Sequence, residues 1–382
     1  MTPHPDDKDP RRIVIIIDNL GLGGAQKLLH VQISEMSKTH HLRIINLGPA
    51  TDLAHSFAAQ GVDVVSQGGM RLTDLRAMLK LRRELAEWRP DLIHSHLLYA
   101  TVIGSVLARL LKVPHVATIH NEKAAATGFT DKVRGWLEQF ALRQMTVVAI
   151  ACGPKIAKIQ SPRVGKTPLV TVSNKIRPAQ HLSPEARHLL RKAAGIADSD
   201  IVVLAAGRLV PQKGFDVLLS AFAQAVKTTP QALLLIVGEG QERIALEQQA
   251  KSLQLADRVR FSGEVPDLGN MLQMADVFAL SSRHEGLPLV LIEALSAALP
   301  IIATRVGDVE TVLDDGCGII VSADQVQPFA SALEQVLASP DLREKMSKSA
   351  GVASQKHSDV ASFIAELQAV YVKAKHFYDT GG

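Results

Sequence analysis

Short apolar runs alternate with longer amphipathic segments along most of the chain. Residues 13–17 are all Ile or Val and lie between Arg12 and Asp18, which predicts a buried strand. Further runs of this kind follow, separated by segments in which apolar residues return with helical spacing. The strands expected in the first half are 12–18, 42–47, 62–65, 92–96, 115–120 and 146–152, and the expected helices are 27–37, 72–88, 99–111 and 131–143. Strands separated by helices predict a doubly wound parallel sheet.

The same alternation returns after a looser stretch between Ser173 and Asp200. Within that stretch, Ser183 and Pro184 predict the start of a helix that ends near Gly195. The later strands are expected at 201–208, 233–240, 259–265, 275–280 and 301–303, and the later helices from 217, at 326–338 and at 359–377. The chain is therefore expected to be α/β, with two Rossmann-like doubly wound parallel-sheet domains. The expected parts are a disordered tail (1–10), a first domain (11–176), a linker (177–199), a second domain (200–358) and a final segment containing the last helix (359–382).

The expected helix 72–88 combines an apolar and a strongly basic face. Its apolar residues are predicted to point inward and its cations outward. The inward set is Leu72, Leu75, Leu79, Leu85 and Trp88, and the outward set is Arg71, Arg76, Lys80, Arg82 and Arg83.

Composition agrees with two α/β domains and excludes several classes of protein. The 382 residues are 47% apolar and only 4% aromatic, and no run approaches the length of a membrane span. The polar N-terminus is not a signal peptide. Cys152 and Cys317 each lie within an apolar stretch, which indicates structural thiols in a reducing, cytoplasmic compartment. The low aromatic content and the lack of a reader motif argue against nucleic acid as a partner.

The net charge of +4 hides an asymmetry between the two halves. Up to Lys175 there are 23 Lys and Arg against 14 Asp and Glu, and from Ile176 onward there are 19 against 24. The cations of the basic half gather on the helix 72–88 and at Lys123, Lys132 and Arg134. Two interpretations stay open: a solvated face, or peripheral contact with an anionic membrane surface on the cytoplasmic side.

Residues 281–311 contain the strongest candidate for a ligand site. The apolar run 275–280 predicts a strand, and Gly286 and Pro288 then open a helix that Pro300 ends. Glu285 therefore lies in a strand-to-helix loop and Glu293 on the helix. The free N–H groups of a first helical turn bind anions, so the stretch suits a ligand with both phosphates and hydroxyls.

Two other loops follow predicted strands. Gly207 to Gly214 brings Arg208 and Lys213 together, and two fixed cations at the carboxyl end of a strand suit a diphosphate leaving group. The Gly-rich loop 19–26 contains Gly23 and Gly24. A dinucleotide-binding fingerprint requires a third Gly where this chain has Gln26, and an acid after the second strand, which is lacking.

These three stretches together resemble the retaining glycosyltransferases of family 4, which have the GT-B fold. The resemblance rests on Glu285 and Glu293 with seven residues between them, on the loop 207–214 and on the Gly-Gly-Ala-Gln loop at 23–26. It implies two domains facing across a cleft, with the acceptor on the first, the nucleotide sugar on the second, and the last helix crossing back to the first. The chain departs from the family at Gln26, where Glu is usual, and at 173–175, where Pro-Asn-Gly is usual.

The resemblance also implies a role for each site residue. Arg208 and Lys213 would hold the diphosphate, Glu285 the sugar hydroxyls and Glu293 the ribose, with His120 near the donor sugar. The remaining donor-binding candidates are Gly286, Leu287, Pro288, Leu289, Val290, Gly238, Val265, Gly23 and Gly24. No metal ion is expected, because side-chain cations take the phosphate charge and His94 and His96 have no third ligand. No cofactor is expected, since the nucleoside-diphosphate sugar is the donor substrate.

The function implied is metal-independent transfer of a hexose from a UDP-sugar or other nucleoside-diphosphate sugar to an acceptor hydroxyl, with retention. The acceptor would be a sugar or a lipid-linked glycan in bacterial polysaccharide, lipopolysaccharide or glycolipid assembly. Two alternatives remain on the same fold. A sugar-nucleotide epimerase would convert its donor without an acceptor, and a non-enzymatic nucleotide-sugar-binding protein would give no turnover.

Overall fold

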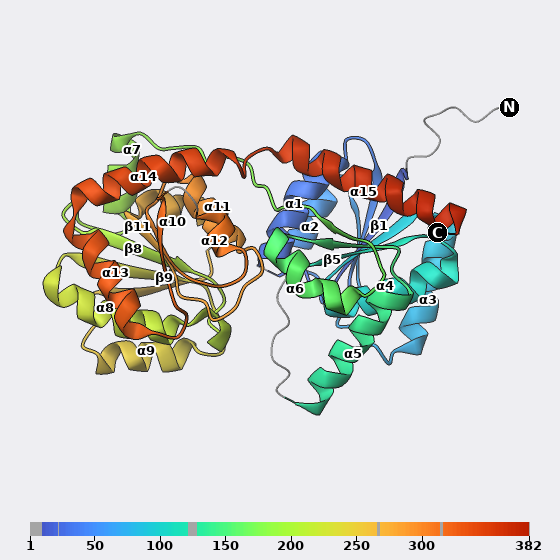
Figure 1. Ribbon diagram of the computed structural model, residues 1–382, viewed down its shortest axis with the longest axis horizontal. Coiled ribbons are helices and arrows are strands. Elements are labelled where there is room, and N and C mark those ends of the chain that lie inside the picture. The colour runs from blue at the N-terminus through green and yellow to red at the C-terminus, as the bar shows by residue number, and fades with distance from the viewer. Residues whose placement is uncertain (1–9, 22, 121–127, 266–267, 314–315, 382) are drawn as a thin grey trace. The chain divides into compact units, whose positions relative to one another are not determined.

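The computed structural model describes residues 10–21, 23–120, 128–265, 268–313 and 316–381 (Figure 1). All of the expected tail except Pro10 lies outside these residues, as does Lys123. The chain forms two compact units. Unit 1 comprises Met1–Asn174 and Val360–Gly382, and unit 2 comprises Lys175–Asp359.

Unit 1 is built on a seven-stranded parallel sheet with the order β3-β2-β1-β4-β5-β6-β7. Its strands are β1 (Arg12–Ile17), β2 (His41–Asn46), β3 (Asp63–Ser66), β4 (Leu92–His96), β5 (His115–Ile119), β6 (Val148–Ala151) and β7 (Leu169–Thr171). Every residue of β4, β5 and β6 is buried, as expected for parallel strands covered on both faces. The doubly wound sheet predicted for the first half is confirmed, while β7 has no counterpart in the sequence prediction.

Helices cover both faces of this sheet. They are α1 (Gly24–Met36), α2 (Asp52–Ala59), α3 (Leu75–Trp88), α4 (Leu98–Leu111), α5 (Phe129–Gln144), α6 (Pro154–Val164) and α15 (Val360–Thr380). α4 packs between α3 and α5, while α15 packs against α1 (Figure 1). The buried Tyr371 fixes α15 to unit 1, because its hydroxyl bonds Gln32 at 2.9 Å and His94 at 2.8 Å.

The inward face predicted for α3 is partly wrong. Leu75 and Leu79 are 72% and 62% exposed, whereas Leu81 and Leu85 are buried. The helix begins later than expected, after Asp74, whose carboxylate accepts from the N–H of Ala77. Leu81 and Leu85 are four residues apart and define the buried stripe, so Leu75 and Leu79 point outward. The predicted exposure of the five cations is confirmed.

Unit 2 is built on a six-stranded parallel sheet with the order β10-β9-β8-β11-β12-β13. Its strands are β8 (Ile201–Ala206), β9 (Ala232–Val237), β10 (Val259–Gly263), β11 (Val277–Leu280), β12 (Ile301–Thr304) and β13 (Gly318–Val321). Its helices are α7 (Pro184–Ala193), α8 (Phe215–Thr228), α9 (Arg243–Ser252), α10 (Leu268–Met274), α11 (Leu289–Ser296), α12 (Val309–Val312), α13 (Val326–Ala338) and α14 (Pro340–Gln355). The core contains Phe222 of α8 and Phe329 of α13, both fully buried.

The stretch 177–199, expected as a linker, belongs to unit 2. Its helix α7 is capped by Ser183, as predicted, and carries Arg187 and Arg191. Both guanidinium groups bind Asp276, just before β11, at 2.7 and 3.2 Å, and Arg191 is only 2% exposed. These long-range contacts fold the segment into the unit.

None of the helices in the described ranges is both long enough and apolar enough to cross a membrane.

Candidate active site

In each unit the strand order reverses next to the first strand, between β1 and β4 in unit 1 and between β8 and β11 in unit 2. Open α/β sheets hold ligands outside the carboxyl ends of strands at such a switch point. Three of these strands lead into stretches that the sequence singled out: 19–26 follows β1, 207–214 follows β8 and 281–288 follows β11.

The loop after β8 places the two predicted cations differently. Arg208 is exposed, and its guanidinium has no hydrogen-bond partner among the described residues. Lys213 ends a short 3-10 turn, Pro211–Lys213, that leads into α8. Gly214 follows at φ 63°, and a Cβ there would lie 2.2 Å from the carbonyl oxygen of Ser281, so only glycine lets this loop meet the loop after β11.

Lys213 and Glu285 come together in this structure. The Lys213 Nζ lies 2.5 Å from the Glu285 Oε1, which also accepts from the Ser282 hydroxyl at 2.6 Å. The two charged side chains are 16% and 7% exposed. Little water reaches these two charges, so each stabilises the other. The ion pair therefore fixes both side chains at the carboxyl edge of the sheet.

Arg283 is a residue that the sequence analysis missed. Its guanidinium binds the Asp216 carboxylate through two hydrogen bonds, at 2.7 and 3.0 Å, and Asp324 at 2.6 Å. Burial acts to raise the pKa of Asp216, but the hydrogen bonds and charge of Arg283 outweigh it and hold that pKa below its ordinary value. Arg283 therefore ties the start of α8 to the loop of Glu285. Its position two residues before Glu285 was the available signal.

The first turn of α11 follows a tightly fixed loop. The Gly286 carbonyl accepts from the Asp308 N–H at 2.9 Å. Gly307 has φ 48°, and a Cβ there would lie 2.0 Å from the same carbonyl oxygen. Leu287, Pro288 and Leu289 are buried and Val290 is half-buried, so the N–H groups that open α11 are held by a packed backbone. Glu293 is half-buried one turn further along the helix.

Gly238 and Val265 follow β9 and β10 at the same edge of the sheet. Gly238 has φ 134°, and a Cβ on it would lie 2.0 Å from the Gly207 carbonyl oxygen. Its N–H donates to the Gly263 carbonyl at 2.7 Å. The loops after β8, β9 and β10 are thus joined through backbone contacts, and Val265 is half-buried beside them.

In unit 1 the glycine-rich loop is closed by Gln26. The Gln26 amide donates to the backbone carbonyl and to the side-chain oxygen of Asn19, both at 3.0 Å. A Glu at this position has no proton to donate to these oxygens, which gives the departure from the family pattern a physical reason. Gly23 lies against this amide, since a Cβ on it would come within 2.6 Å of the Gln26 Oε1, and Gly24 begins α1.

His120 follows β5 and lies in a row of histidines. Its Nε2 is 2.9 Å from the Nδ1 of His96, while His94 bonds Thr118 at 2.7 Å. Burial lowers the pKa of His120 to about 4 and holds that of His96 well below its ordinary value, so both rings are neutral at pH 7. The His96 Nε2 is buried without a hydrogen-bond partner in the described part of the chain.

Asp18, the first residue after β1, is a second residue for which no role was predicted. Its carboxylate accepts from the N–H of Ala100 at 2.6 Å and of Tyr99 at 3.3 Å, in the first turn of α4. Burial raises its pKa to about 6, although these two hydrogen bonds oppose the shift. An acid directly after a buried strand at a switch point was the available signal.

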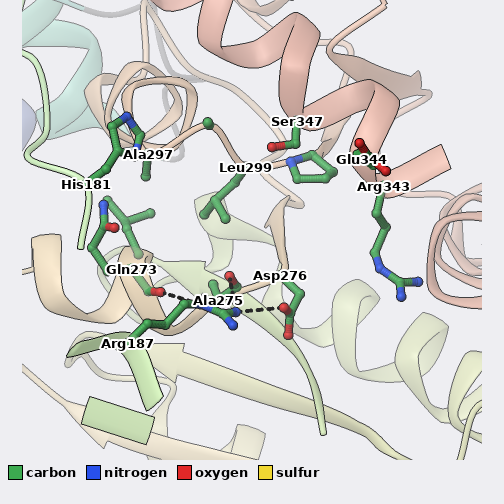
Figure 2. A pocket seen from close by; sticks show the side chains of 13 residues that line it. His181, Arg187, Gln273, Ala275, Asp276, Ala297, Leu299, Arg343, Glu344 and Ser347 are labelled. Atoms are coloured by element: carbon green, nitrogen blue, oxygen red, sulfur yellow. Dashed lines mark hydrogen bonds and ion pairs between the residues drawn. The ribbon is translucent and has the colours of Figure 1, made fainter. Parts of the chain in front are cut away.

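Within the described ranges, no group of three or more His, Cys, Asp or Glu could hold a metal ion. A pocket of about 360 Å³ lies at the opposite, amino-terminal edge of the unit 2 sheet, before β11 and β12. Figure 2 shows Arg187 and Asp276 bound to each other within it. Arg343, which also lines it, donates to the carbonyls that end α13. The two arginines of this pocket thus already have hydrogen-bond partners, whereas Arg208 has none among the described residues.

Comparison with known proteins covers both units. Residues 23–175 match a family described as a glycosyl transferase 4-like domain, and residues 186–351 match glycosyl transferases group 1. The chain is 30% identical over 290 residues to the D-inositol 3-phosphate glycosyltransferase of Saccharomonospora viridis, covering 70% of this chain and 67% of that one. It is 28% identical over 304 residues to the UDP-Gal:alpha-D-GlcNAc-diphosphoundecaprenol alpha-1,3-galactosyltransferase of Escherichia coli, covering 76% and 77%.

Among solved structures, the Anabaena protein HepE in complex with UDP-glucose superposes with a TM-score of 0.84. The sequence identity is 20%, and the match covers 94% of this chain and 99% of that one. At this identity the likeness shows the fold alone, and it confirms the α/β class with two Rossmann-like sheets.

Proposed function

The chain belongs to the glycosyl transferases group 1, the family 4 type with the GT-B fold, and from this premise we propose how its site handles the nucleotide-sugar donor. As a glycosyltransferase it transfers a sugar from a nucleotide sugar. The observation that carries the proposal is the Lys213–Glu285 pair at the carboxyl edge of the unit 2 sheet. Arg208, which has no hydrogen-bond partner among the described residues, lies in the same loop as Lys213.

The donor diphosphate is proposed to bind Arg208 and Lys213. Arg208 has a planar group with five N–H donors and no competing partner among the described residues, so it can bind an incoming phosphate without breaking an existing bond. Lys213 reaches the same edge while holding Glu285. The N–H groups of Leu289 and Val290 open α11 and add a helix N-terminus, which favours anions.

The hydroxyls of the donor are proposed to bind the two carboxylates. A carboxylate only accepts hydrogen bonds, and hydroxyls donate them, so the chemistry is complementary. Glu285 is assigned to the transferred sugar and Glu293, on α11, to the ribose. Backbone groups near Gly238 and Val265 are assigned to the base, which leaves uridine and guanosine open.

Transfer is proposed to proceed with retention and without a metal ion. As the glycosidic bond breaks, negative charge grows on the leaving diphosphate, and fixed cations stabilise that charge in the transition state. Glu285 is held by Lys213 and Ser282, which suits it to orient a hydroxyl rather than attack the anomeric carbon. The acceptor hydroxyl is therefore proposed to attack from the face that the diphosphate leaves, and to give its proton to that diphosphate.

The carboxyl edge of unit 1, with Gly23, Gly24 and His120, is proposed to contact the sugars. We assign the shared proton to the Nδ1 of His96, so that the Nε2 of His120 accepts it and the Nδ1 of His120 carries its own proton, which it can donate to a sugar hydroxyl. The acceptor is proposed to be a lipid-linked sugar used in cell-surface glycan assembly, because the named acceptor of the Escherichia coli relative is a diphosphoundecaprenol.

A donor screen tests this proposal. Thermal unfolding is measured with UDP, GDP and their sugars, because a ligand that binds only the folded state raises the melting temperature with its concentration. The stabilising donor is then incubated with an undecaprenyl-diphosphate sugar, with and without EDTA, and the anomeric configuration of the product is read by NMR. A new alpha linkage from an alpha donor, formed in EDTA, supports the proposal. Conversion of the donor alone indicates an epimerase, an inverted product contradicts retention, and loss of activity in EDTA contradicts metal independence.

A further inference from the structure

Helix α5 exposes large apolar side chains on the side that faces away from the sheet. Phe129 is 81% exposed, Trp136 63% and Phe140 48%, and Val133 is exposed between them. Steps of four, three and four residues place these four side chains on one face of the helix. The opposite face is buried through residues that include Ala141 and Leu142. Packing of α5 against the rest of unit 1 therefore does not require these four exposed apolar side chains.

Two further helices on the same face of the sheet also expose apolar side chains. Leu75 and Leu79 of α3 are 72% and 62% exposed, and Leu110 of α4 is 46% exposed. Because α4 packs against both α3 and α5, the three helices cover the same face of the unit 1 sheet, away from α15 (Figure 1). Seven of the fourteen exposed large apolar side chains in the described residues lie on these helices. We name this region the α3–α5 surface. A gathering of this kind marks an interaction site.

The charged residues near these exposed apolar side chains indicate which kind of partner binds this surface. Arg76 and Arg82 of α3 and Lys132 of α5 are exposed, and none has an acidic partner among the described residues. The acids of α3 are taken up by its other cations, Glu84 by Lys80 and Glu87 by Arg83. Unit 1 as a whole holds 24 Lys and Arg against 16 Asp and Glu. The surface therefore presents apolar groups and uncompensated positive charge together.

We propose that unit 1 docks on an anionic lipid bilayer through the α3–α5 surface. Trp136, Phe129 and Phe140 enter the boundary between headgroups and acyl chains, where aromatic side chains are favoured. Arg76, Arg82 and Lys132 meet the lipid phosphates. A second copy of the chain fits less well, because a symmetric contact would bring two sets of unpaired cations together.

The position of the surface also connects it with the acceptor. α3 and α5 follow β3 and β5, so both begin at the carboxyl edge of the sheet, where His120 lies. A bilayer held against these helices presents lipid-linked sugars beside that edge. This link to the acceptor rests on the proposed function, whereas docking requires no turnover.

Cosedimentation with vesicles tests the docking. The full chain is mixed at low salt with phosphatidylcholine vesicles that contain or lack phosphatidylglycerol. We expect sedimentation with the anionic vesicles only, and release in 0.5 M salt, at which surface charges are screened to about 3–5 Å. Replacing Phe129, Trp136 and Phe140 by Ser is expected to weaken partitioning at least about tenfold. Each of Arg76→Gln, Arg82→Gln and Lys132→Gln is expected to weaken it about fivefold.

A matched control comes from unit 2, where Leu189, Ile244 and Val352 are 64%, 70% and 61% exposed. Replacing these three by Ser is expected to leave sedimentation unchanged. Far-UV circular dichroism checks that both triple variants are folded. Lys213→Met should sediment like the wild type even if it is inactive, which separates docking from the proposed function. Three results would overturn the inference: no sedimentation at low salt, equal loss in both triple variants, or an aromatic face that controls dimerisation and not vesicle binding.

Discussion

The Lys213–Glu285 pair provides the sharpest test of how unit 2 holds its site. The perturbation is a set of three variants: Lys213→Met, Glu285→Gln and the two together. Lys213→Met keeps the length of the side chain but leaves the Glu285 side chain, 7% exposed, with only the Ser282 hydroxyl as a donor among the described residues. Glu285→Gln keeps the shape and lets the partly exposed Lys213 reach water.

The structure sets the expected magnitudes. Removing one partner of a buried ion pair costs about 3–5 kcal/mol, and we expect the lower end for Lys213→Met because Ser282 still donates to the carboxylate. For Glu285→Gln we expect about 1–2 kcal/mol, the range of a lost hydrogen bond. The double variant leaves no buried charge unpaired, so it should be more stable than the sum of the single losses predicts, by about 2 kcal/mol. A loss of about 3 kcal/mol lowers the melting temperature of a domain of this size by about 6–12 °C.

Differential scanning calorimetry of the full chain measures these losses. Both Trp residues and all three Tyr residues lie in unit 1, so Trp fluorescence follows that unit separately. Hydrogen exchange of peptides from β8 and β11 assigns the changed transition to unit 2. If the losses of the two single variants simply add in the double variant, the two groups are not energetically coupled, and the reasoning from their 2.5 Å contact fails.

Three further predictions follow from the same structure. Arg208→Ala should lower kcat by about two to three decades. Stability should not fall, because Arg208 has no hydrogen-bond partner among the described residues. An effect on KM alone would mean that Arg208 only captures the donor. His96→Phe should lower kcat, because it removes the group that orients His120. In His96→Asn the amide can replace the Nδ1, so this variant should keep most of the wild-type kcat. An equal loss of kcat in both variants would indicate that His96 has a packing role. Unit 1 should unfold in acid. In the folded chain His94 and His115 have pKa values of about 3 and His120 of about 4, whereas the same rings in the unfolded chain bind protons near pH 6.5. The free energy of unfolding is therefore highest above pH 6.5 and decreases as the pH falls, by about 2 kcal/mol for each ring at pH 5. Asp18, with its pKa raised to about 6, offsets only part of this loss, and Trp fluorescence that stays native down to pH 4 would contradict the prediction.

Local patterns in the sequence predicted most of the secondary structure. Ile13 to Ile17 and the other apolar runs became buried strands because a parallel sheet covered on both faces excludes polar side chains. Two glycines of the predicted loops were informative for a different, steric reason: at Gly214 and Gly238 no Cβ fits. The family resemblance is a property of short segments, and it made Arg208, Lys213, Glu285 and Glu293 candidate site residues.

Tertiary contacts decided the rest. The direction of Leu75 and Leu79 depends on which side of α3 meets the sheet, and the sequence pattern assigned both to the wrong face. The pairing of Lys213 with Glu285, of Arg283 with Asp216 and of His96 with His120 joins residues far apart in the chain. No periodicity connects such residues. They meet because parallel strands bring their carboxyl ends to one edge, and their protonation and bonding then depend on how much water that edge excludes.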